Sequence, residues 1–246
     1  MIPETPKVDL EELLVTVIRV GLELNYEGRA LAWALDYPGC FAFGEEGPQA
    51  IIALAPALVR YQAWVNRKAG EPLIELGDFD LRLVDTWTVY SMDDAYEESP
   101  EGYAVNAWFK QDWKPLQAGE IERGLALLRW SRADLLALIT DLSPQELDEK
   151  RAGERWSLGG IARHIANAEW WYLDRLALVS TPWESLPAEL PERLAAVRAN
   201  LEVVLPDLAG KALVVGKDGE FWSPRKLLRR AVEHEIDHFQ HLLSLL

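Results

Sequence analysis

Cysteine is nearly absent from this sequence, because Cys40 is the only one among 246 residues. A single thiol cannot form a disulfide within the chain, and such a composition is typical of a reducing compartment. Apolar runs of the roughly 18 residues that a membrane-spanning helix needs are also missing. The first residues, MIPETPKVDLEELL, lack the basic start and apolar centre of a signal peptide. We therefore expect a cytoplasmic protein.

Basic residues are outnumbered, with 25 Lys and Arg against 40 Asp and Glu, which gives a net charge of −15. An acidic surface repels the phosphates of nucleic acids and anionic lipid headgroups. We therefore expect neither nucleic acid nor a membrane as a partner, and a small molecule or a second copy of the chain remains open.

The first half of the chain has the composition of strands around one helix. Alternating and β-branched residues predict strands, a helical spacing of apolar residues predicts one helix with Pro56 inside it, and NYEG and YPGC supply turns. The strands are expected at 13–23, 28–36, 40–44 and 79–90, and the helix at 48–68. Pro56 predicts a kink or a late start.

The second half has the periodicity of helices. Four segments carry apolar residues at helical spacing, and Ser223 followed by Pro224 is a strong signal for a helix start. These segments are 119–142, 157–178, 190–205 and 223–245. Together with the first half they predict an α+β protein with three parts: an α/β sandwich domain over 1–92, an acidic linker over 93–117 and a four-helix bundle over 118–246.

Histidine is scarce, and three of the four histidines fall within AVEHEIDHFQH at 231–241. On a helix His234, His238 and His241 share one stripe at the margin of the apolar face. Residues spaced i and i+4 lie one above the other, so His234 and His238 can bind one metal ion. The remaining histidine, His164, lies at the edge of an apolar arc on the second predicted helix. We expect it to complete the site.

Three neutral imidazoles leave coordination positions open for water or substrate, as catalytic metal sites do. Imidazole suits zinc, nickel, iron or copper. The alternative is that these histidines are packed core residues without a metal. A favourable interaction with the C-terminus of the helix is sufficient to explain the presence of His241. We therefore expect His241 at the rim of the pocket and not among the metal ligands.

Two carboxylates, Glu169 and Glu235, fall inside apolar arcs and need partners if they are buried. Arg123, Arg163 and Arg175 are candidate partners, and a histidine N–H is another. Glu235 is also a candidate pocket residue. Trp171 shares the stripe of His164 and is a candidate pocket wall, although core packing is an equal alternative for it.

The residues HEIDH at 234–238 match the H-E-x-x-H pattern of zinc proteases, in which the glutamate is the general base. Here Glu235 would take that role. The third ligand usually lies downstream of this pattern, and only His241 is available there. It lies on the same stripe of the same helix and would leave the ion poorly enclosed, so we rank this function last.

The second half resembles the DinB/YfiT-like superfamily of four-helix bundles. The likeness rests on RWSLGGIARHIANAEWWYLDRL at 155–176 and RRAVEHEIDHFQHL at 229–242, in which Trp156, His164, His234 and His238 match the family pattern. The resemblance implies a divalent metal on the three histidines, zinc or nickel above all. Some members are transferases or isomerases that use a low-molecular-weight thiol. His241 departs from the glutamine that members often carry.

Residues 28–65 resemble the HicB-like antitoxin fold, through Pro38, Gly39 and Cys40 in a turn that leads into a helix. This resemblance implies a scaffold for interaction, dimerisation or pocket lining. We expect Cys40 to be a packed turn residue. Two functions then lead: a metal-dependent transferase or hydrolase for a small molecule, linked to a thiol, and a non-catalytic binding protein with a structural metal.

Overall fold

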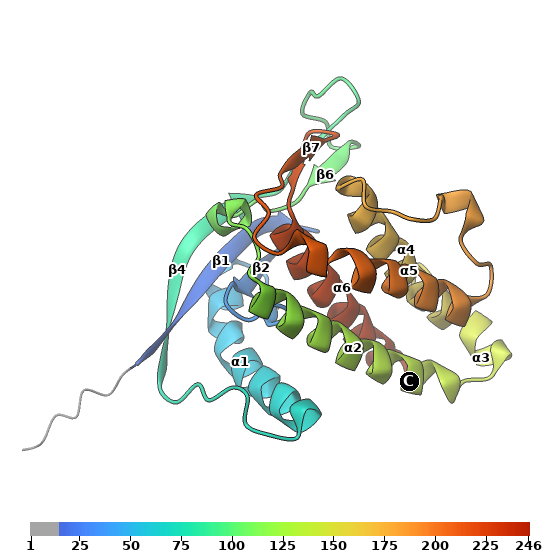
Figure 1. The fold of residues 1–246 in the computed structure, drawn as a ribbon, viewed down its shortest axis with the longest axis horizontal. Coiled ribbons are helices and arrows are strands. Elements are labelled where there is room, and N and C mark those ends of the chain that lie inside the picture. Colours follow the sequence, from blue (N-terminus) through green and yellow to red (C-terminus); the bar gives the residue numbers. More distant parts are fainter. Residues whose placement is uncertain (1–14) are drawn as a thin grey trace, which may run out of the picture.

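The computed structural model describes residues 15–246 and has the predicted α+β composition (Figure 1). A sheet occupies the N-terminal half and long helices occupy the C-terminal half. The first two residues of the strand predicted at 13–23 lie outside the described residues. Within residues 15–246, no helix combines the length and the apolar character needed to cross a membrane.

Four strands form the main sheet in the order β3-β2-β1-β4. β1 pairs in parallel with β4, and the other pairs are antiparallel. The strands are β1 (Thr16–Tyr26), β2 (Arg29–Ala34), β3 (Phe41–Gly44) and β4 (Phe79–Thr88). The turn between β1 and β2 lies in the predicted NYEG, where Asn25, Glu27 and Gly28 have positive φ angles.

Helix α1 (Gly47–Ala69) covers one face of this sheet with its apolar side chains. The backbone of Glu46 donates to the side chain of Gln49 and closes the first turn, while Gly70 ends the helix with a φ of 75°. The helix continues through Pro56, whose side chain is exposed, so the predicted late start is wrong.

The predicted linker at 93–117 carries structure of its own. β5 (Tyr90–Met92) pairs with β6 (Tyr103–Val105), and a 3-10 turn follows at Lys110–Trp113. Ala107 and Phe109 are fully buried and pack with Leu31, Trp33 and Leu35 on the second face of the sheet. This segment therefore joins the sheet to the helices by packing. The division into domains stays a prediction.

The four long helices of the C-terminal half lie within a few residues of the predicted ranges. They are α2 (Ala118–Thr140), α4 (Leu158–Arg175), α5 (Leu190–Val204) and α6 (Pro224–Leu245). The sequence did not predict the short α3 (Pro144–Asp148), two 3-10 turns (Trp183–Ser185 and Pro206–Leu208) or the hairpin of β7 (Val215–Lys217) and β8 (Glu220–Trp222).

Helix α6 packs against α2 and α4, and its buried side chains share one core with those of the sheet and α1 (Figure 1). On one face Gly124 of α2 approaches so closely that an added Cβ would lie 2.5 Å from Leu228. One and two turns further along the same face, Gly39, with a φ of +83°, brings the turn before β3 against Val232 and Ile236. This face of α6 is therefore closely covered, and the side chains at its margins become the lining of any cleft nearby.

Candidate metal centre

Three histidines from two packed helices converge on one point. His164 comes from α4, while His234 and His238 come from successive turns of α6. Nε2 of His234 lies 3.1 Å from Nε2 of His164 and 3.1 Å from Nε2 of His238. One ligand atom from each residue lies within 4.8 Å of the other two. The structure thus brings together the three residues that the sequence predicts as ligands.

Burial keeps these imidazoles neutral. It lowers the pKa of His164, with a smaller contribution from Arg155, and lowers the pKa of His238 to about 3. The pKa of His234 falls well below its ordinary value, first by burial and then through the two neighbouring histidines. Neutral imidazole is the protonation state that binds a metal.

The donor set fits a divalent transition metal. Nε2 of His234 can either donate or accept one hydrogen bond, so it cannot satisfy both neighbouring nitrogens. A shared cation removes this conflict, because all three nitrogens can direct lone pairs at it. Zinc at its usual distance of 2.0–2.1 Å from nitrogen holds two ligands about 3.4 Å apart, close to the two separations observed here.

The histidine cluster lies on the wall of an open cleft of about 1200 Å³. The lining also includes residues of the turn between β1 and β2, so both halves of the chain contribute. Trp156 stacks on His164 with ring centroids 4.5 Å apart. The aromatic lining consists of Tyr26, Trp156, Trp170, Trp171, Tyr172 and Trp183. A cleft of this size with aromatic walls is suited to a small organic ligand.

Two of the predicted pocket residues line this cleft. Trp171 packs edge-on against Trp222 of the β7–β8 hairpin, with ring centroids 5.2 Å apart. His241 stays outside the histidine cluster, because its Nε2 lies 3.1 Å from a carboxylate oxygen of Glu154. The role of His241 at the rim of the pocket stays a prediction.

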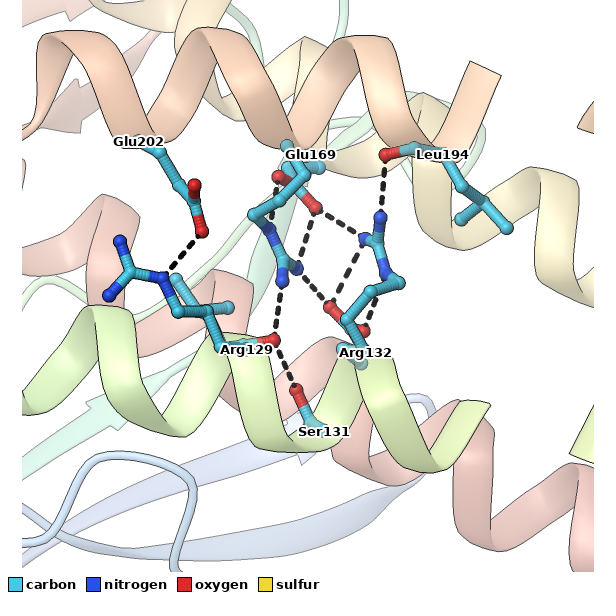
Figure 2. Close-up of polar contacts among 9 residues, drawn as sticks. Arg129, Ser131, Arg132, Glu169, Leu194 and Glu202 are labelled. Atoms are coloured by element: carbon cyan, nitrogen blue, oxygen red, sulfur yellow. Dashed lines mark hydrogen bonds and ion pairs between the residues drawn. The ribbon is translucent and has the colours of Figure 1, made fainter. Parts of the chain in front are cut away.

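Glu235 is placed elsewhere, in a buried cluster of four charges with Glu169, Arg132 and Arg198. Arg132 of α2 donates to Glu235 at 2.8 Å. It also donates to Glu169 at 2.7 Å (Figure 2). Arg198 of α5 pairs with the same two glutamates. Burial alone would raise the pKa of Glu169, but Arg198 and Arg132 outweigh it and lower that pKa.

The partners of these carboxylates differ from those expected from the sequence. Arg123, Arg163 and Arg175 were the candidates, whereas Arg132 and Arg198 form the contacts. Because both oxygens of Glu235 are bound by arginine, its carboxylate is held away from the histidine cluster. This geometry gives no support to Glu235 as the general base of a zinc protease.

Several polar residues of the cleft were not expected from the sequence. Arg230, Asn167 and Asn106 are among them. Arg230 had a signal that could have found it, because it lies four residues before His234 and eight before His238 on α6 and so shares their stripe. Asn106 had none, because its position depends on how the segment after β6 packs.

A sequence model of the DinB superfamily matches residues 127–242. This segment is similar to the DinB superfamily, and it includes all three histidines of the cluster. The match leaves residues 1–126 uncovered, so the HicB-like resemblance stays a prediction. No curated protein and no solved structure matches the chain.

Proposed function

We propose that this protein is a metal-dependent enzyme for a small molecule, with a divalent transition metal held by His164, His234 and His238. The observation that carries the proposal is the position of the three convergent Nε2 atoms on the wall of an open aromatic cleft. The similarity of residues 127–242 to the DinB superfamily supports it, because proteins of this superfamily generally bind a divalent metal.

The residues of the chain have separate tasks in this proposal. The histidines hold the ion in a neutral, half-buried setting, while Trp156 and Trp171 shield one side of the cleft from water. When bound, zinc or nickel lowers the pKa of a water or thiol ligand and supplies a nucleophile near neutral pH. We infer a transferase or hydrolase, with a low-molecular-weight thiol as the co-substrate of a transferase.

We further infer that α2, α4, α5 and α6 form the four-helix bundle of DinB-like proteins, and that the N-terminal sheet is a HicB-like module. The alternative function is a binding protein in which the metal is structural. A structural site is normally enclosed by four protein ligands, whereas this cluster offers three and faces a cleft. The open arrangement therefore favours the enzyme.

The experiment that tests the proposal is the metal content of untagged protein, measured by mass spectrometry for the wild type and for His238→Ala. We expect about one transition metal per wild-type chain and a loss of the metal in the variant. His241→Ala is the matched control. It removes an imidazole one turn further along α6 and should keep its metal.

Absence of metal in the wild type, together with no uptake of added zinc or nickel, would refute the proposal. Equal loss in His241→Ala would show that the ligand set is wrong. If the metal binds but its removal collapses the fold and no thiol or electrophile is turned over, the structural alternative is favoured instead.

A further inference from the structure

Arg230 lies on the same stripe of α6 as His234 and His238 and lines the same cleft. Its side chain is only 7% exposed. The guanidinium lies over Tyr26, with Cζ 5.6 Å from the ring centroid. A permanent positive charge is therefore buried one turn from the histidine cluster.

This buried arginine is compensated by one long ion pair with Glu233 and by the hydroxyls of Tyr26 and Tyr172, not by a carboxylate in hydrogen-bonding geometry. Nε and Nη1 are enclosed and have no hydrogen-bond partner among residues 15–246. The nearest carboxylate oxygen, from Glu233, lies 3.5 Å from Nη1 and is itself without a hydrogen bond. A buried charge with incomplete hydrogen bonding is costly, and a ligand in the cleft can supply a missing partner.

The neighbouring Arg229 is equally buried, and its Nε and Nη1 also have no hydrogen-bond partner among the described residues. Its Nη2, however, donates to Asp112 at 2.8 Å and to the carbonyl of Ala107 at 3.0 Å. Arg132 and Arg198 have two carboxylates each. Arg230 differs from them in having a guanidinium at the cleft without a carboxylate in hydrogen-bonding geometry.

The other charged side chains that line the cleft form no hydrogen bond or ion pair with Arg230 among the described residues. Glu154 contacts His241, and Glu27 lies 3.8 Å from Arg29. Asp237 also lines the cleft, and it has no salt bridge to Arg230 among the described residues. Two asparagines, Asn106 and Asn167, add neutral polar groups.

We propose that Arg230 binds the carboxylate of a substrate whose apolar or aromatic body lies against Trp156, Trp171 and Tyr172. This inference rests on the proposed function and specifies its substrate class: a small aromatic or apolar carboxylic acid. Nη2 is not among the enclosed nitrogens of Arg230, and a carboxylate can accept a charged hydrogen bond from it. Anchored there, the ligand extends along the stripe toward His234 and His238.

The test uses phenylacetate and its neutral analogue phenylacetamide as probes, with binding followed by calorimetry and by tryptophan fluorescence. Zinc-loaded and metal-free wild-type protein are both titrated. We expect phenylacetate to bind at least about tenfold more tightly than the amide, because a charged hydrogen bond to arginine is lost in the amide. Arg230→Met should remove this preference.

Two further variants keep the test interpretable. Arg230→Lys retains the charge without the fork and should keep only part of the preference. Arg155→Met removes an exposed cation that lines the same cleft and should change the preference by no more than about twofold. Thermal unfolding and metal content of each variant verify that the fold and the histidine cluster are intact.

The outcomes separate this inference from the proposed function. A wild type that holds zinc but does not distinguish the two probes refutes the inference and leaves the function standing. Preference for phenylacetate in a protein that binds no metal supports the Arg230 site and refutes the metal-dependent function. An unchanged preference in a folded Arg230→Met variant, or stronger binding of phenyl phosphate than of phenylacetate, overturns the assignment.

Discussion

At the scale of single residues, two constraints require glycine at position 39. Gly39 has a φ of +83°, and a Cβ added to it would lie 2.5 Å from the side chain of Val232. Gly28 has nearly the same φ, +80°, with nothing within 4 Å of an added Cβ. We predict that Gly28→Ala lowers the free energy of unfolding by about 1 kcal/mol through backbone strain alone. Gly39→Ala should cost about 3 kcal/mol, because overpacking against α6 is added. Urea unfolding of both variants measures the difference, and equal losses would contradict the packing argument.

Lys226 is fully buried beside Glu220, with Nζ 2.6 Å from a carboxylate oxygen. Burial lowers the pKa of this lysine from 10.5 to about 8, and Glu220 offsets only part of that effect. Between pH 8 and 10.5 the unfolded chain therefore binds more protons at this site than the folded chain does. In this range the free energy of unfolding rises with pH.

We predict that the wild type gains about 1 kcal/mol between pH 8 and pH 9 relative to the double variant Lys226→Met/Glu220→Gln. The double substitution removes both charges and so leaves no unpaired carboxylate. Urea unfolding at each pH measures the free energies. A difference between the two proteins that is independent of pH would exclude the lowered pKa of Lys226.

At the scale of elements, the buried cluster of Arg132, Glu169, Arg198 and Glu235 joins α2, α4, α5 and α6. Removing one arginine leaves buried carboxylates without full compensation. We predict that Arg132→Met lowers the free energy of unfolding by about 3–5 kcal/mol.

Arg129→Met is the matched control on the same helix. Arg129 pairs with Glu202 at 2.9 Å, but its side chain is 58% exposed (Figure 2). Loss of this surface pair should cost less than about 1 kcal/mol. Chemical denaturation compares the two variants, and a small effect in Arg132→Met would show that the buried cluster contributes little to stability.

The elements themselves were largely predictable, because their signals are local. Apolar periodicity and the cap at Ser223 predict the helix at 223–245, and α6 occupies 224–245. The i, i+4 spacing also places His234 and His238 together. The partners of Glu235 were not predictable, because Arg132 and Arg198 are distant in sequence and meet it only through the packing of three helices.

At the scale of the whole molecule, the burial of side chains on α6 differs from the burial that its sequence pattern predicts. Its helical wheel places Arg229 and Glu233 opposite the histidine stripe, on a polar side. Both residues are buried in the structure, because the segment after β6 covers that side and Asp112 pairs with Arg229. A single-helix pattern cannot reveal a second layer of structure. The polar side of α6 is thus an internal surface between the sheet and the helices.

This coverage predicts that residues 118–246 are not an independent folding unit. Isolated, they would expose Val232 and Ile236, which Gly39 now contacts, and would leave Arg229 without Asp112. We expect the isolated segment to melt without a cooperative transition or to aggregate, as judged by circular dichroism and sedimentation. The control is the full chain cleaved within the exposed residues 94–98, whose two pieces should remain associated and unfold cooperatively. A monomeric fragment that unfolds cooperatively near the temperature of the full chain would instead establish residues 118–246 as a separate domain and 93–117 as its linker.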